Sequence, residues 1–243
     1  KTIIQTRIAR NITQTYLGNK AGERVLNGEI RRGDGNETNA DVWYSDLRNS
    51  TALADTMPSD EFIQLLNVYF ECAASPAIEA GGEILDFIGD AVLAIFPFDC
   101  EENLPLAAEA ATNALRRAVE VTEAVNRDRK AAGVLPIEFG VGLNVGPVMF
   151  GNIGIPERLT FSVIGPTVNE VARIEKLTKA IESNALVTKQ IASLDPKSWT
   201  STGLHRLDGV AQKIELFTLN ETAHPISVET ELRSEIVTPE IQH

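Results

Sequence analysis

Residues 83–97, EILDFIGDAVLAIFP, contain two short apolar runs, 83–88 and 91–97, separated by Gly89 and Asp90. Two such runs around a Gly-Asp pair are typical of a β-hairpin. Upstream, residues 40–46 form another apolar run, ADVWYSD, which ends on Asp46. The pattern therefore predicts a sheet with Asp46 at the end of one strand and Asp90 at the turn of a hairpin.

These two aspartates adjoin apolar segments, where a carboxylate is costly to bury unless it is paired or binds a cation. If strand pairing brings Asp46 and Asp90 together, the pair fits one or two Mg²⁺ or Mn²⁺ ions that act on a phosphate substrate. The spacing also fits a plainer interpretation, in which Asp46 caps a turn and Asp90 makes the hairpin bend.

Periodicity elsewhere predicts further helices and strands. Helices are expected from Ser59, as N-cap, to a bend or end at Pro76, and over residues 104–131 and 167–180. Strands are expected over residues 137–144, 148–153, 159–164, 204–207 and 214–219, with a turn at Gly146 and Pro147. The order begins βαββαβ, which predicts an α+β fold with a ferredoxin-like core and extra C-terminal strands.

Composition narrows the class of protein. The chain has 243 residues, 43% of them hydrophobic, and a formal net charge of -12. This acidic balance argues against binding to nucleic acid or to anionic membrane, because both need a basic face. With only Cys72 and Cys100, we expect reduced thiols and a cytoplasmic location rather than disulfides or a zinc site.

The organisation along the chain is expected to be simple. We interpret residues 1–38 as an N-terminal connector with a helix over 11–30, residues 39–220 as the main domain, and residues 221–243 as a flexible polar tail. No apolar stretch approaches the roughly 20 residues of a membrane span. Because the chain begins at Lys1, a sensor or membrane domain upstream remains open.

Asn169 and Arg173 lie four residues apart in the last expected helix and therefore on one face. An arginine suits charge that develops on a transferring phosphorus, and an asparagine amide can orient a ribose oxygen. A solvated polar face explains the pair equally well in isolation.

Several motifs, taken in order, resemble the catalytic domain of bacterial-type class III nucleotidyl cyclases. They run from about residue 39 to 220 and are SDLRNST (45–51), GGEILDFIGD (81–90), GVGLNVG (140–146), GNIG (151–154), VIGPTVNEVARIE (163–175) and LDGV (207–210). The resemblance implies a ferredoxin-like core that works as a head-to-tail homodimer with two sites at the interface.

The resemblance also implies the chemistry. Asp46, Asp90 and the Leu47 carbonyl would hold two Mg²⁺ or Mn²⁺ ions, and catalytic Asn169 and Arg173 would come from the other chain. The ribose 3′-oxygen of ATP would attack the α-phosphate to give 3′,5′-cyclic AMP and pyrophosphate, in intracellular signalling.

The triphosphate is expected to lie against Asn49, Ser50, Thr51 and Arg206. Asp208 stands where a basic residue often meets the triphosphate in the family, so Arg206 or Lys213 would substitute.

Asp86 and Ser162 occupy the base-selecting positions of the family, with Asp86 in place of an adenine-selecting lysine. An acceptor at Asp86 fits guanine N1–H, whereas adenine N1 requires a donor. Guanylate cyclase activity on GTP is therefore the alternative to adenylate cyclase activity on ATP.

Two other functions remain open at this level. A catalytically weak cyclase-like module that serves regulation or dimerisation is one, although such a module has no chemical need for Asp46, Asp90, Asn169 and Arg173 together. A palm-type polymerase or a dinucleotide cyclase shares the ferredoxin-like core and the two-metal mechanism. The helix with Asn169 and Arg173 gives this interpretation no support.

Overall fold

The computed structural model describes residues 7–8, 10–13, 26–28, 35–155, 157–210 and 212–220. The strands are β1 (Gly35–Leu47), β2 (Glu83–Ile88), β3 (Ala91–Phe98), β4 (Phe139–Ile155), β5 (Arg158–Ile164), β6 (Ala185–Thr188), β7 (Trp199–Arg206) and β8 (Lys213–Leu219). The helices are α3 (Ser50–Thr56), α4 (Ser59–Glu79), the 3-10 turn η1 (Glu101–Asn103), α5 (Leu104–Ala131), α6 (Pro166–Ile181) and α7 (Lys189–Ala192).

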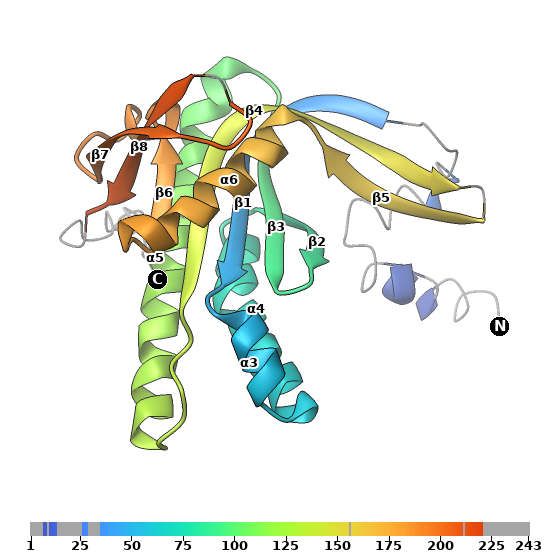
Figure 1. Ribbon diagram of the computed structural model, residues 1–243. Helices are drawn as coiled ribbons and strands as arrows, with labels where there is room; N and C mark the ends of the chain where they lie inside the picture. Colours follow the sequence, from blue (N-terminus) through green and yellow to red (C-terminus); the bar gives the residue numbers. More distant parts are fainter. Residues whose placement is uncertain are drawn as a thin grey trace, which may run out of the picture.

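The strands form one sheet in the order β2-β3-β1-β4-β6-β8-β7, and β5 pairs with β4. Antiparallel pairing predominates, and only β4 and β6 run parallel. Helix α6 crosses one face of the sheet, while β4 and β5 extend beyond it as an arm, and the start of β1 pairs with β4 at the base of this arm (Figure 1). This architecture confirms the predicted α+β fold.

Residues 40–45 of β1 are almost entirely buried, on both faces of the sheet, which fits the mainly apolar run in this segment. Trp43 and Leu47 belong to the core shared with α4 and α5, whereas Ala40 and Val42 belong to the core shared with α6. Side chains alternate along a strand, so Asp46 points to the same face as Val42. The first metal candidate therefore lies on the α6 side of the sheet.

Several predicted elements are confirmed. The hairpin of β2 and β3 turns at Gly89, whose φ of 65° suits glycine. Helix α5 has the predicted bounds, and its alanines at 107, 111, 114 and 118 are buried against the sheet. Helix α6 and strand β5 also occupy the predicted segments within one residue.

The predicted turn at Gly146 and Pro147 was wrong, because β4 runs through both residues without a break. Thr167, in the first turn of α6, donates its hydroxyl to the Pro147 carbonyl over 2.8 Å. A Cβ placed on Gly146 would lie 2.5 Å from the Thr167 Oγ1. The glycine therefore accommodates a close helix contact instead of a chain reversal.

Helix α4 also differs from its prediction at both ends. Pro58, not Ser59, occupies the N-cap position, and no side chain caps the helix there. The helix continues through Pro76 to Glu79. Ala73 and Ala77, which flank Pro76, are fully buried, and this packing near the helix end outweighs the one backbone hydrogen bond that a proline removes.

Other boundaries needed correction. Strand β1 starts at residue 35 instead of 40, β7 starts at residue 199 instead of 204, and helix α3 occupies part of the loop expected after Asp46. Strand β6 and helix α7 were not predicted. Most of the helix expected over residues 11–30, and the whole tail over 221–243, lie outside the described residues. Among the helices that are described, none has the length and apolar content to cross a membrane.

Candidate active site

Strand pairing brings Asp46 and Asp90 together. Asp46 lies opposite Ala91 of β3 and Gly140 of β4, and the Leu47 N–H donates to the Asp90 carbonyl over 3.4 Å. Both carboxyl groups are half-buried. Burial, followed by the charge of Asp90, raises the pKa of Asp46 to about 7. Below that pH a proton therefore competes with a cation for Asp46.

This donor set fits a hard divalent cation, since Mg²⁺ and Mn²⁺ prefer carboxylate and carbonyl oxygens. Within the part of the chain that the structure describes, no three His, Cys, Asp or Glu side chains cluster closely enough to hold a metal. Protein ligation would thus rest on the two aspartates and the Leu47 carbonyl, with room for substrate oxygens and water.

The predicted phosphate-binding residues Asn49, Ser50 and Thr51 follow directly after β1. Asn49 adopts a left-handed conformation with φ of 60°, and Ser50 and Thr51 form the first turn of α3. The Lys179 Nζ, near the end of α6, donates to the Asn49 Oδ1 over 3.0 Å. This contact ties the turn beside the metal candidates to the far end of α6.

Arg206, the fourth predicted phosphate ligand, lies away from that turn on the β7–β8 hairpin. It is exposed and pairs in register with Lys213, which is also exposed. Two cations therefore pair in register near Asp208, the position at which the resemblance described above led us to expect a basic residue.

Asn169 and Arg173 lie together on the outer side of α6. They line a cavity of about 580 Å³ with Gly165, Pro166, Glu170, Gly209 and Val210. The Arg173 guanidinium lies close to Gly209, where an added Cβ would be 3.5 Å from its Nη2. Asp46 and Asp90 do not line this cavity, so one chain presents the two halves of the predicted site in different places.

The two residues predicted to select the base lie on β2 and on β5, a strand of the arm. Asp86 is exposed on β2, and Ser162 is half-buried on β5, opposite Gly151. Strands β2 and β5 contact each other.

The sequence analysis missed two titratable groups beside the aspartate pair. Tyr44 shares the face of Asp46, and burial, then the charge of Asp46, raises its pKa. Burial, then Asp46, raises the pKa of Glu175 to about 7. The alternation of side chains along β1 pointed to Tyr44, whereas nothing in the sequence placed Glu175 beside Asp46.

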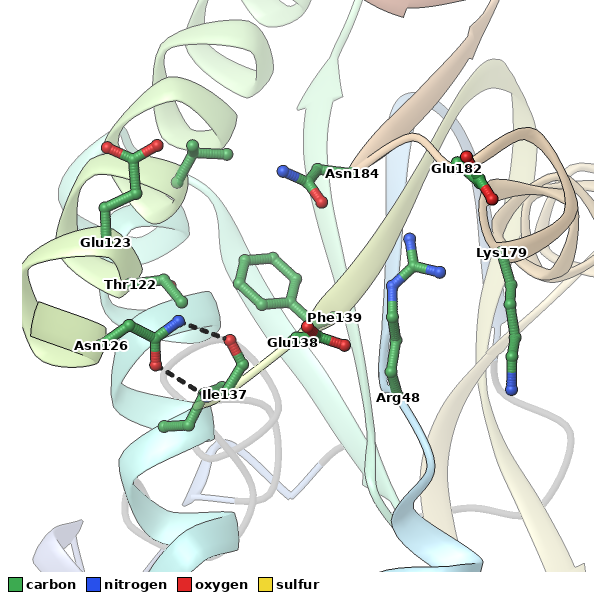
Figure 2. Close-up of a pocket in the computed structure, with 11 residues that line it drawn as sticks. Arg48, Thr122, Glu123, Asn126, Ile137, Glu138, Phe139, Lys179, Glu182 and Asn184 are labelled. Carbon is green, nitrogen blue, oxygen red and sulfur yellow. Dashed lines mark hydrogen bonds between the residues drawn. The ribbon is translucent and has the colours of Figure 1, made fainter. Parts of the chain in front are cut away.

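A second cavity, of about 490 Å³, lies between α5, the start of β4 and the end of α6 (Figure 2). The Asn126 side chain bonds both the N–H and the C=O of Ile137 on its wall. Its cations are already engaged, because the Arg48 Nη2 donates to the Ser183 carbonyl over 2.6 Å and Lys179 holds Asn49. Through these two hydrogen bonds, Arg48 and Lys179 connect the turn after β1 to the end of α6 and the residues that follow it.

Comparison with known proteins identifies the family of the chain. The profile of the family "Adenylate and Guanylate cyclase catalytic domain" matches residues 35–220. An adenylate cyclase of Anabaena cylindrica is 31% identical over 150 residues, which cover 62% of this chain and 29% of that protein. The terminal-differentiation specific adenylate cyclase of Dictyostelium discoideum is 32% identical over 149 residues, or 61% of this chain and 7% of that protein. The chain thus spans less than a third of the length of these relatives.

Solved structures share the fold. The adenylyl cyclase CyaB from P. aeruginosa has a TM-score of 0.66 at 23% identity, covering 78% of this chain and 97% of that one. The guanylyl cyclase Cya2 has a TM-score of 0.64 at 25% identity, covering 79% and 97%. Since the family profile covers most of the sequence and the fold agrees, the chain belongs to the adenylate and guanylate cyclase catalytic domain family.

Proposed function

We propose that this chain converts ATP to 3′,5′-cyclic AMP and pyrophosphate at sites formed between two copies of itself. The observation that carries the proposal is the half-buried pair of Asp46 and Asp90, which strand pairing brings together and in which the charge of Asp90 helps to raise the pKa of Asp46. Two carboxylates in such surroundings favour a cation. Because the chain belongs to the cyclase family, we infer that the cation acts on a nucleoside triphosphate.

In this proposal Asp46, Asp90 and the Leu47 carbonyl bind two Mg²⁺ or Mn²⁺ ions. When bound, the ions supply a lowered pKa at the ribose 3′-hydroxyl and neutralise the triphosphate. The 3′-oxygen bonds to the α-phosphorus, the bond to the bridging oxygen of the β-phosphate breaks, and the hydroxyl proton passes to water. No protein side chain is needed as a general base.

Asn169 and Arg173 would complete the site from the second copy. Their cavity on the outer side of α6 excludes the aspartate pair of the same chain, which favours a composite site. Arg173 would stabilise charge at the α-phosphate and Asn169 would orient the ribose. Asn49, Ser50 and Thr51 would bind phosphates, and Arg206 would replace the cation absent at Asp208.

GTP is the second candidate substrate. The exposed Asp86 carboxylate can accept hydrogen bonds from guanine N1–H and its amino group, and Ser162 lies on the neighbouring strand. The alternative of a weak regulatory module predicts no substantial turnover of either nucleotide.

The decisive experiment incubates the purified chain with Mn²⁺ and either ATP or GTP and identifies the product by mass spectrometry. We expect cyclic AMP as the main product. If GTP gave more cyclic GMP than ATP gave cyclic AMP, the result would instead support guanylate cyclase activity. Asp46→Ala and Asp90→Ala should abolish turnover, while Asp60→Ala, an exposed carboxylate on α4, should not change it. Absence of any cyclic nucleotide would refute the enzymatic proposal.

Removal of Arg173 tests the composite site separately. Arg173→Ala should lower the turnover rate by roughly 10²- to 10³-fold, the usual effect of losing one donor to developing charge. Nucleotide binding, measured by isothermal titration, should change little. Loss of binding with an unchanged maximal rate would contradict the assigned role.

A further inference from the structure

Glu175 is a buried carboxyl group on the inner side of α6 that none of the proposed roles uses. It is 7% exposed and its Oε1 accepts a hydrogen bond from the Thr178 Oγ1 over 3.4 Å. A Cβ placed on Gly140 of β4 would lie 2.5 Å from this same Oε1. The carboxyl group therefore lies directly against the backbone of β4.

The rest of α6 approaches β4 equally closely. A Cβ on Gly142 would lie 2.6 Å from the Val171 carbonyl oxygen and 2.9 Å from the Glu175 nitrogen. At the start of the helix, Thr167 bonds the Pro147 carbonyl next to Gly146. Helix α6 thus bonds β4 at its first turn through Thr167, and further along the Glu175 and Thr178 side chains lie directly against Gly140.

The strand under Glu175 also adjoins the metal candidates. Gly140 is the register partner of Asp46, and α6 contacts β1 as well as β4. Glu175 does not itself join a metal-binding cluster of three within the described ranges. Through Gly140, Glu175 therefore connects α6 to the part of the sheet where β1 ends.

The position of α6 on β4 also determines where the side chains on the outer side of the helix lie. Successive residues on an α-helix are about 100° apart, so Arg173 and Glu175 point in nearly opposite directions. Arg173 and Asn169 line the outer cavity, while Glu175 faces the strand. A rotation or a rise of α6 on β4 would displace both outer side chains.

We infer that Glu175 is a positioning residue, which sets the height and rotation of α6 on β4 and so places Asn169 and Arg173 for the site of the partner chain. The inference rests on the proposed function. In this arrangement α6 of one chain contributes Asn169 and Arg173 to the site whose metals are bound by the partner chain. A change at Glu175 should therefore lower the activity of that site. It should not affect the site whose metals are bound by its own chain.

A mixed dimer separates these two effects. Combining differently tagged Asp46→Ala and Arg173→Ala chains leaves one intact composite site, with its metals on the Arg173→Ala chain and its helix from the Asp46→Ala chain. Activity of this mixture tests the proposed function. An inactive mixture would refute the composite site, and the inference with it.

Glu175→Ala is then added to one chain at a time. On the Asp46→Ala chain, which lends the helix, we expect the maximal rate to fall about 10- to 100-fold, the scale of a misplacement near 1 Å. The Mn²⁺ concentration for half-maximal rate and the KM for ATP should stay within twofold. On the Arg173→Ala chain, the same substitution should change the rate less than twofold.

The conservative variant and an exposed carboxylate on another helix provide controls. Glu175→Gln on the lending chain should restore most of the rate, because its amide oxygen fills the same space and accepts from Thr178. Glu79→Ala, which removes an exposed carboxylate at the end of α4, should leave the rate unchanged. Equal losses from both chains, or a raised Mn²⁺ requirement with Glu175→Ala on the metal-holding chain, would overturn the inference.

A shorter acid keeps the test open if Glu175→Ala does not fold. Glu175→Asp retains the carboxyl group but withdraws it by one methylene from Gly140. On the lending chain it should lower the maximal rate at least threefold with unchanged KM. A rate equal to that of the parent mixture would refute the positioning role.

Discussion

Asp41 is the least favourably placed carboxyl group of the described chain, and replacing it with valine should stabilise the fold. It is fully buried on β1 between Phe96 and Val145, and neither of its oxygens has a hydrogen-bond partner. It points to the same face as Trp43 of the core beneath α4 and α5. Burial raises its pKa well above the usual value, so the folded chain keeps this group protonated to a higher pH than the unfolded chain does.

The expected gain has two parts. An unpartnered buried polar group costs about 1–3 kcal/mol, and this part is independent of pH. The unfolded chain releases the Asp41 proton above a pH of about 4, whereas the folded chain retains it, so the fold loses about 1.4 kcal/mol of stability per pH unit up to the raised pKa. The advantage of Asp41→Val should therefore grow as the pH rises.

Urea unfolding, followed by the fluorescence of the buried Trp43 and Trp199, measures this advantage. Wild type and Asp41→Val are compared at several pH values from 4 upward, and the difference cancels other groups that titrate equally in both proteins. Asp41→Asn provides a matched control, because it removes the ionisation but leaves an unpartnered polar side chain. It should reproduce the pH-dependent part without the constant part.

Two results would refute this reasoning. If Asp41→Val were less stable than wild type at pH 7, the site would need a polar group that the contacts do not reveal. If the difference between the two proteins were the same at pH 5 and pH 7, the carboxyl group would not be held protonated by burial.

Three shorter predictions concern the site and its support. Because the pKa of Asp46 is about 7, a proton competes with the cation below that pH. The Mn²⁺ affinity, measured by calorimetry, should therefore fall roughly tenfold from pH 6 to pH 5. A constant affinity would contradict proton displacement. Ser45→Ala removes a buried hydrogen bond of 2.9 Å to the Tyr69 hydroxyl and should cost about 1–3 kcal/mol in urea unfolding, with no added cost in a Tyr69→Phe background. Gly142→Ala would press on the Val171 carbonyl and should destabilise the fold by about 1–3 kcal/mol; an unchanged unfolding midpoint would show that α6 can move away from β4.

Much of the fold was predictable because it depends on local patterns. The hairpin at Gly89 and the long helix α5 were predicted from turn residues and apolar periodicity, which act over a few neighbouring residues. The pairing of Asp46 with Asp90 followed from the same elements, since adjacent antiparallel strands bring their ends together.

The errors arose where long-range packing overrode a local rule. Gly146 and Pro147 carry a turn signature, yet β4 passes through them because Thr167, from a helix 20 residues later, lies on that glycine. Pro76 failed to end α4 because the helix buries Ala73 and Ala77 around it. Strand β6, only four residues long, was too short to show a period.

The sequence by itself determined the class of fold, the two aspartates and the helix with Asn169 and Arg173, because these depend on residue type, spacing and order. Only the tertiary structure decided which groups surround them. It placed Glu175 against the strand that pairs with Asp46, left Asp41 without a partner, and separated Arg173 from the aspartates of its own chain. The physical reason is that burial, desolvation and contact between a helix and a strand depend on elements distant in the sequence, which meet only when the sheet forms.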